Sequence, residues 1–193
     1  MYNILFTNAG RRATLLKDFQ KSLGKSAKII ATDNWCVAPA LFVADKYYLS
    51  PKIQDPNYIT FLLEICKKEK VNAVTSLIDP EIMLLAKNRQ TFIENGILPL
   101  VPDKETAEIC FDKYKTARFI ESLGLRTPKT YVAYNEAVAA IKVGELKFPL
   151  ILKPRWGSGS IGLEFVDDLE ELEMVYQLDR KKVMKSILAT ASV

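Results

Sequence analysis

Over the first hundred residues, short apolar runs alternate with stretches in which apolar residues recur every three or four positions. The short runs predict buried strands at residues 4–6, 29–32, 47–49, 73–78 and 97–101. The longer period predicts helices between them, with apolar positions such as Leu15, Leu16, Phe19, Leu23, Ile59, Leu62, Leu63, Cys66, Ile82, Leu85, Ala86, Phe92 and Ile93. Strands separated by such helices predict βαβ units and a parallel sheet. We therefore expect a three-layer α/β domain over residues 1–102.

The pattern changes in the second half of the chain. It predicts two helical stretches, an extended segment, a short helix, two strands and a final helix, at residues 103–123, 127–132, 136–141, 150–152, 163–166 and from 169 onward. About ninety residues with only two or three strands provide a thin core for an independent domain. Residues 103–193 are therefore expected to form an incomplete α+β domain.

Composition sets limits on the function. The chain has 193 residues, of which 49% are hydrophobic and 26% are charged, as in ordinary globular proteins. A net charge of +4 is too small to indicate a nucleic-acid partner. The chain has no apolar run near the length of about 18 residues that a membrane span needs, and its start lacks the pattern of a signal peptide. We expect a cytoplasmic protein without a membrane partner.

Cysteine and histidine usage narrows the chemistry further. The three cysteines, Cys36, Cys66 and Cys110, are widely spaced and partly set among apolar residues, which predicts buried, reduced thiols. The chain contains no histidine. A zinc site and a histidine-activated nucleophile are therefore not expected, and no residue is assigned to a metal. Any catalysis would depend on lysine, arginine, carboxylates or backbone groups.

A glycine-rich loop is the most informative motif of the chain. Gly157, Ser158, Gly159, Ser160 and Gly162 lie between the two expected strands of the second half, and Lys153 precedes them. Glycine lets backbone N–H groups turn toward a phosphate, and a nearby lysine adds positive charge. The order differs from a Walker motif, because the lysine comes before the glycines. The pattern indicates a strand–loop–strand phosphate site; the alternative is a flexible hairpin whose lysine lies on an edge strand.

Lys113 occupies an unusual position for a charged residue. It shares a helical stripe with the apolar residues Ala117 and Ile120, and it falls in the first turn of a helix that begins near Asp112. A cation in that turn opposes the helix dipole. A residue that breaks two local rules is a candidate site residue. The alternative is a lysine whose stem covers a partly buried face while its ammonium reaches solvent.

Two further candidates lie at the ends of strands in the first half. Gly10, Arg11 and Arg12 follow the first strand at the start of a helix, which suits an anionic ligand as well as it suits a plain surface turn. Asp33 lies where a dinucleotide enzyme places its ribose-binding acid, but a single glycine does not make the dinucleotide fingerprint. Asp79 and Glu81 follow the fourth strand. Asp79 is expected to be a helix N-cap, and Glu81 also fits the helix N-terminus without any role in binding.

Taken together, these segments resemble the ATP-grasp superfamily, in particular proteins similar to carbamoyl phosphate synthase. The resemblance covers nearly the whole chain and rests on the order and spacing of five segments, at residues 7–12, 76–81, 110–116, 125–128 and 148–162. It implies a Rossmann-like pre-ATP-grasp domain over residues 1–102 and the first ATP-grasp subdomain over 103–193. Lys113 and Lys153 match the two basic residues that contact nucleotide phosphates in such enzymes. The loop from Gly157 to Gly162 matches their mobile lid.

The resemblance also implies a function. Family members use ATP to activate a carboxylate as an acyl phosphate, which they pass to an amine or a similar nucleophile. It implies ATP as the cofactor, with Mg²⁺ whose ligands would lie beyond this chain, and a small carboxylate or amine as the substrate. Possible contacts to that substrate are Gly10, Arg11, Arg12, Asp79, Glu81 and Arg155. A second chain, or a further C-terminal part, would complete the site. The alternative is a non-catalytic nucleotide- or anion-binding module that acts through a partner chain.

Overall fold

The computed structural model describes residues 2–157, 159, 160 and 162–185, and it divides into two compact units, Met1–Ala107 and Glu108–Val193. Each unit is described by itself. The boundary expected at residue 102 stays a prediction. Ser158, which was expected to belong to the phosphate loop, lies outside the described residues, as does the end of the chain from residue 186.

The first unit is built on a five-stranded parallel sheet with the strand order β3-β2-β1-β4-β5. The strands are β1 (Tyr2–Thr7), β2 (Ala27–Asp33), β3 (Lys46–Leu49), β4 (Ala73–Ser76) and β5 (Leu98–Pro99). The helices are α1 (Ala13–Leu23), α2 (Tyr58–Lys68), α3 (Asp79–Lys87) and α4 (Arg89–Glu94), with 3₁₀ turns at Gly24–Ser26 and Pro39–Phe42. A further helix, α5 (Lys104–Phe111), begins in the first unit and ends in the second. The predicted α/β class with a parallel sheet is confirmed.

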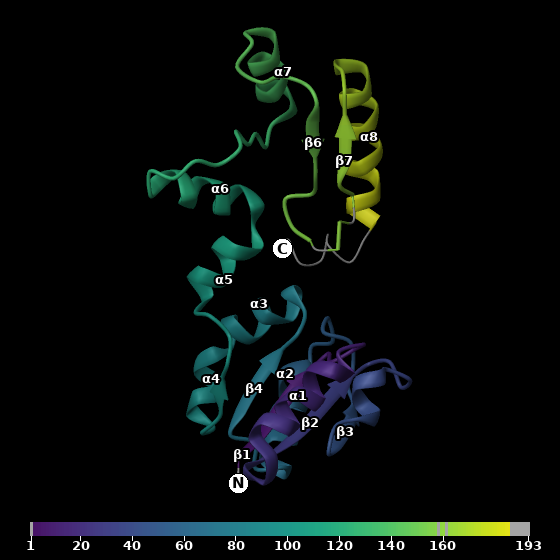
Figure 1. Cartoon of the computed structure of the whole chain (residues 1–193), viewed down its shortest axis with the longest axis vertical. Coiled ribbons are helices and arrows are strands. Elements are labelled where there is room, and N and C mark those ends of the chain that lie inside the picture. The colour runs from purple at the N-terminus through teal and green to yellow at the C-terminus, as the bar shows by residue number, and fades with distance from the viewer. Residues whose placement is uncertain (1, 158, 161, 186–193) are drawn as a thin grey trace. The chain divides into compact units, whose positions relative to one another are not determined.

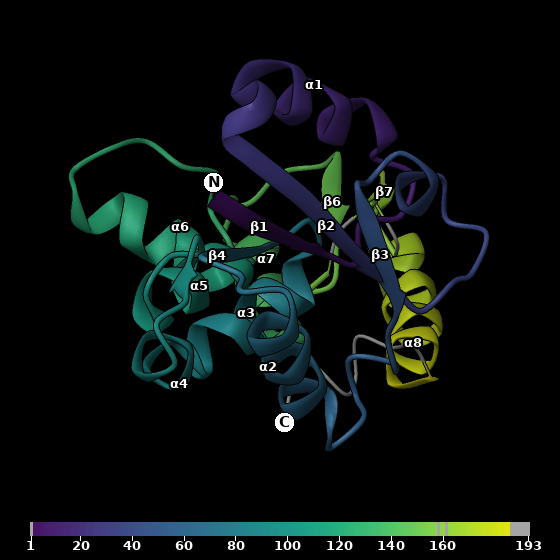
Figure 2. The same cartoon turned by 90° about the horizontal axis from the view of Figure 1, so that it is seen from below.

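Two hydrophobic layers cover the two faces of this sheet. Successive side chains of a strand point to opposite faces, so that Leu5 packs with α2 and α3 while Phe6 packs with α1. The first layer contains Leu5, Ile30, Tyr58, Leu62, Ile65, Cys66, Val71, Val74, Leu85, Phe92 and Ile97. The second contains Phe6, Ala9, Leu16, Ile29, Ala31, Ala38, Ala40 and Leu41. Figure 2 shows α1 on one side of the strands and α2 with α3 on the other.

Three local expectations for this unit were wrong. The single helix expected after the fourth strand is two helices, because Asn88 leaves helical geometry and its amide donates to the Leu84 carbonyl at 2.8 Å. The fifth strand is short and contains Leu98 and Pro99; the N–H groups of Leu98 and Leu100 donate to β4 and to the residue that precedes it, so the missing N–H of Pro99 does not account for its length. Asp79 does not cap α3: it is the first residue of the helix, Ile78 occupies the N-cap position, and no side chain caps the helix.

The second unit contains fewer elements. Its helices are α6 (Lys113–Ser122), α7 (Tyr134–Lys142) and α8 (Leu169–Lys185), and its strands β6 (Leu150–Leu152) and β7 (Glu164–Val166) pair antiparallel. Figure 1 shows α8 running beside the two strands. The opposite face of the strand pair exposes Ile151 and Phe165, which face each other in register. Among the described residues of this unit, the buried apolar side chains are few: Ala117, Ala140, Val166 and Leu172.

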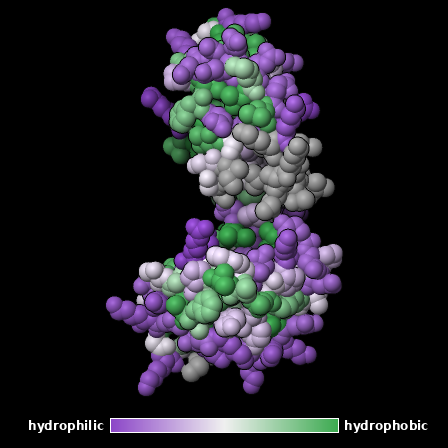
Figure 3. Space-filling model, turned by 90° about the vertical axis from the view of Figure 1, so that its right-hand side faces the viewer, coloured by the Kyte–Doolittle hydropathy of each residue, from purple (hydrophilic) through white to green (hydrophobic). Residues whose placement is uncertain are grey.

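Hydrophobic residues also reach the surface. The face drawn in Figure 3 carries them scattered among hydrophilic residues. At the β3 edge of the first unit, Phe42, Tyr47 and Leu49 are about half exposed or more, and the rings of Phe42 and Tyr47 lie 6.4 Å apart between centroids. The expectation that all three cysteines are buried was wrong: Cys66 is buried, but Cys36 and Cys110 are exposed. Cys36 follows β2 in a surface loop, and Cys110 lies on the outer side of α5.

Candidate functional site

In the second unit, the N-terminus of α6 meets the glycine-rich loop. The Lys113 ammonium donates a hydrogen bond to the Gly157 carbonyl at 2.8 Å, and the Lys113 backbone N–H donates to the Arg155 carbonyl at 3.0 Å. Two expected site residues that lie 44 positions apart in the sequence are therefore in direct contact.

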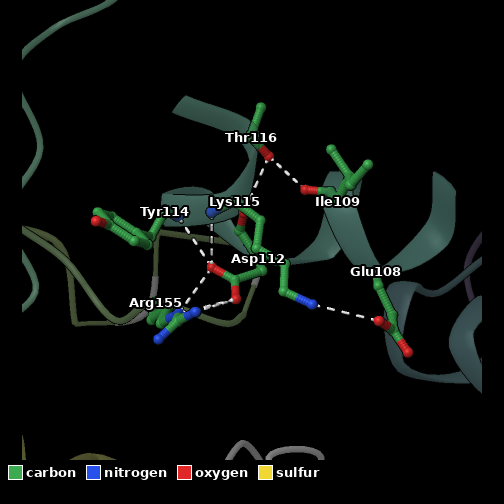
Figure 4. A network of polar contacts seen from close by, with 7 residues as sticks. All are labelled: Glu108, Ile109, Asp112, Tyr114, Lys115, Thr116 and Arg155. Carbon is green, nitrogen blue, oxygen red and sulfur yellow. Dashed lines mark hydrogen bonds and ion pairs between the residues drawn. The ribbon is translucent and has the colours of Figure 1, made fainter. Parts of the chain in front are cut away.

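An ion pair fixes this meeting point. Arg155 donates from Nε to both oxygens of Asp112 at 2.8 Å, and its Nη2 lies 2.7 Å from Oδ2. The Oδ1 atom of Asp112 also accepts from the backbone N–H groups of Tyr114 and Lys115, at 3.0 and 3.1 Å, which makes Asp112 the N-cap of α6 (Figure 4). Burial disfavours the Asp112 charge, but the bonds from Arg155 and Lys115 outweigh it and hold the pKa of this carboxyl below its usual value.

The glycine loop has the backbone geometry that its sequence predicts. Gly157, Gly159 and Gly162 have φ values of 123°, 68° and 71°, and Ser160 also has a positive φ of 58°. A Cβ at Gly162 would lie only 2.9 Å from Cγ of Pro154, so a larger residue does not fit there.

Lys153 lies at the end of β6, where its side chain is exposed. Among the described residues, its ammonium makes no hydrogen bond or ion pair. The convergence of Lys113 and Lys153 on one phosphate stays a prediction. Arg155, which was expected to contact substrate, forms an ion pair with Asp112.

In the first unit, the expected turn at residues 7–12 is held by Asp33. One carboxylate oxygen of Asp33 accepts from the Gly10 N–H at 2.7 Å and the other accepts from the Trp35 N–H at 2.9 Å. Gly10 has a φ of 55°, which favours glycine. Arg11 and Arg12 are exposed beside the turn. Asp33 thus has a structural task in shaping the candidate anion site.

Glu81 lies at the centre of a buried polar cluster. Its side chain is fully buried, and it accepts hydrogen bonds from Asn8 Nδ2 at 2.7 Å, from Ser76 Oγ at 2.6 Å and from the Tyr58 hydroxyl. Burial, together with the nearby Glu81 charge, raises the pKa of Tyr58 far above its usual value. The cluster joins the carboxyl ends of the neighbouring strands β1 and β4. Asp79 is exposed at the start of α3.

The sequence did not reveal the partners of these residues. Asp112 belonged to the recognised motif, but its pairing with Arg155 was missed, because the two lie 43 positions apart. Asn8, Tyr58 and Ser76 were missed as partners of Glu81. The sequence did contain a signal for two of them, because Asn8 and Ser76 are polar residues at the ends of apolar strands, and such strand ends lie side by side in a parallel sheet.

The described residues contain no group of three or more histidine, cysteine or acidic side chains that could hold a metal ion. In the described part of the chain, no helix is long and apolar enough to cross a membrane.

Solved structures share this fold. The biotin carboxylase domain of the 2-oxoglutarate carboxylase from Hydrogenobacter thermophilus, in complex with MgADP, ADP and bicarbonate, superposes with a TM-score of 0.71 at 21% identity, covering 95% of this chain and 41% of that chain. At this level of identity the similarity concerns the fold.

The sequence also matches the models of two protein-domain families. The model of the PylC-like N-terminal domain matches residues 4–100, and the model of the ATP-grasp domain matches residues 110–192. The chain therefore belongs to the ATP-grasp superfamily, with a PylC-like N-terminal domain in front of its ATP-grasp region.

Curated relatives agree with this assignment. The formate-dependent phosphoribosylglycinamide formyltransferase of Saccharolobus solfataricus is 26% identical over 151 residues, which are 78% of this chain and 36% of that protein. The carbamoyl phosphate synthase large chain of Neisseria meningitidis serogroup B is 28% identical over 87 residues, which are 45% of this chain and 8% of that protein. The chain thus spans well under half the length of these relatives.

Proposed function

We propose that this chain forms the phosphate-binding part of an ATP-dependent ligase of the ATP-grasp type. One observation carries the proposal: the Lys113 ammonium lies 2.8 Å from the Gly157 carbonyl, which brings a helix lysine onto the glycine loop. Lysine ammonium and loop N–H groups are the donors that bind phosphate oxygens. A phosphate is a stronger acceptor than a carbonyl and would draw the ammonium to itself.

The described residues fit the phosphates of a nucleotide. Lys113, Ser160 and the loop glycines Gly157, Gly159 and Gly162 would contact them, with Lys153 reaching them from the end of β6. Ser158, which lies outside the described residues, stays a candidate from the sequence. Mg²⁺ would arrive with the nucleotide, and no protein ligand is assigned to it here. When bound, ATP supplies a γ-phosphoryl group that can be transferred to a carboxylate oxygen to give an acyl phosphate.

The substrate of such an enzyme would be a small carboxylate, and an amine would accept the activated acyl group. The turn formed by Gly10, Arg11 and Arg12 supports an anionic group, because two exposed guanidinium groups flank a helix N-terminus. Glu81 is fully buried, so we assign it the task of holding Asn8 beside this turn. The cytoplasmic location stays a prediction.

The experiment is a titration of ADP, with Mg²⁺ present, into the full chain and its lysine variants. Lys113→Met and Lys153→Met should each weaken binding by roughly tenfold or more, since a charge-assisted contact is typically worth about 1.5–3 kcal/mol. Lys115→Met is the matched control, because Lys115 lies on the same helix and its ammonium pairs with Glu108 at 3.3 Å. Unchanged affinity in both site variants would refute the proposal.

A further inference from the structure

A single buried carboxylate has two tasks at the start of α6. Asp112 is only 3% exposed, and its oxygens accept from two backbone N–H groups of α6 as well as from the Arg155 guanidinium. The N–H bonds define where the helix begins. The bonds to Arg155 attach that beginning to the segment between β6 and the glycine loop (Figure 4).

Lys113 lies inside this attachment. It directly follows Asp112, and its N–H donates to the carbonyl of Arg155, the residue that holds Asp112. Its ammonium then reaches Gly157, two positions beyond Arg155. The backbone N–H and the side-chain ammonium of Lys113 are therefore both bound by residues 155–157, the segment that the Asp112–Arg155 ion pair holds.

The surroundings of Arg155 restrain its side chain further. The guanidinium carbon lies 5.4 Å from the centre of the Tyr114 ring and 4.8 Å from that of the Trp156 ring. With Nε and Nη2 bonded to Asp112, the planar fork is set in one orientation. A lysine at this position would keep the charge but could not make the forked contact.

From this geometry we infer that Asp112 and Arg155 are positioning residues, whose ion pair holds the start of α6 against the 153–157 segment and thereby aims the Lys113 ammonium at the glycine loop. The inference rests on the proposed function only where it takes Lys113 as a phosphate-binding residue. The ion pair and its effect on the loop can be tested without any nucleotide.

The first test uses Trp156 as a reporter. The chain has two tryptophans, so Trp35→Phe makes Trp156 the single tryptophan of the protein. In that background, Asp112→Asn keeps a good N-cap but loses the charge that holds Arg155. We expect Trp156 emission to shift and acrylamide quenching to rise at least twofold, with unchanged helical circular dichroism. Arg155→Lys should give a smaller change of the same sign.

Asp103→Asn is the matched control for this test. Asp103 accepts from the N–H of Thr106 at 2.9 Å at the start of α5, and no arginine of the described residues pairs with it. The emission and quenching of Trp156 should stay unchanged in this variant. Unchanged Trp156 quenching in both Asp112→Asn and Arg155→Lys would overturn the inference.

The second test is a double-mutant cycle on ADP binding in the full chain. Arg155→Met should weaken binding about tenfold in the natural background and less than twofold in the Lys113→Met background, because Arg155 acts through Lys113. Losses that add in the double variant would overturn the inference and make Arg155 a direct ligand of the nucleotide. If Lys113→Met itself has no effect on ADP affinity, the proposed function fails, and the Trp156 test still decides the role of the ion pair.

Discussion

At the scale of single residues, backbone conformation and burial decide which substitutions the chain tolerates. Gly159 and Gly162 of the phosphate loop look alike in the sequence, yet only Gly162 of these two is also confined by a neighbour. Gly162 faces the ring of Pro154, whereas a Cβ at Gly159 would meet nothing within 4 Å.

We therefore expect Gly162→Ala to destabilise the second unit more than Gly159→Ala does. Both alanines must adopt a positive φ, at a cost of about 1–2 kcal/mol. Gly162→Ala also pushes a methyl group against the rigid Pro154 ring, which adds about 1–3 kcal/mol. Thermal unfolding followed by Trp156 fluorescence in the Trp35→Phe background measures the two melting temperatures. Equal melting temperatures for the two variants would contradict this account.

The Tyr58 hydroxyl gives a second test at this scale. It donates to the buried Glu81 carboxylate, and Tyr58 is 1% exposed. Tyr58→Phe leaves Glu81 with one donor fewer in a place that water does not reach. It should lower the free energy of unfolding by about 1–3 kcal/mol in a urea titration. Tyr2→Phe, at a residue that is 66% exposed, is the control and should change it little.

At the scale of elements, the C-terminal end of α2 is bound to the sheet by Glu69. Its carboxylate pairs with Lys46 at 2.5 Å and with Lys28 at 3.6 Å, and it accepts from the Tyr48 hydroxyl. The bonds from Lys46 and Tyr48 hold the pKa of Glu69 below its usual value of 4.5. The folded state therefore binds this proton more weakly than the unfolded state does.

This stabilisation is present above the pKa of the unfolded chain and is lost as the pH falls through the lower pKa of the folded chain. Glu69→Gln should therefore lower the melting temperature at pH 7 by about 2–4 °C and flatten its decline below about pH 4.5. Glu64→Gln on the same helix, where Glu64 is exposed, should leave both unchanged. A Glu69→Gln profile parallel to that of the unmodified chain at every pH would contradict the prediction.

At the scale of the whole molecule, the two units differ in how complete their cores are. The first has two hydrophobic layers on a parallel sheet, whereas the described part of the second exposes the Ile151–Phe165 face of its strand pair. The match to the formyltransferase of Saccharolobus solfataricus covers 78% of this chain and 36% of that protein.

We expect the 193-residue chain by itself to bind ADP but not to release it from ATP with Mg²⁺. The reason is that the chain aligns with well under half the length of its curated relatives. A coupled assay of ADP release tests this with the purified chain and a mixture of amino acids as substrates. Steady turnover that Lys153→Met abolishes would contradict the prediction and would also exclude the alternative of a non-catalytic binding module.

The sequence by itself determined the α/β class, the order of the elements and the motifs of the ATP-grasp superfamily. These depend on local periodicity and on residue types at short spacing, such as the apolar runs of the strands and the glycines after Lys153. Asn88 shows the limit of this approach even for elements, because one side-chain hydrogen bond accompanies the division of the predicted helix into α3 and α4.

Only the tertiary structure decided which residues work together. Folding pairs Arg155 with Asp112, rests Lys113 on Gly157 and surrounds Glu81 with Asn8, Tyr58 and Ser76. These partners lie far apart in the chain, except Ser76, and nothing in the local pattern distinguishes a buried carboxylate from an exposed one. Burial and pairing depend on how whole elements pack, and for that reason Asp79 and Glu81, two positions apart, have opposite surroundings.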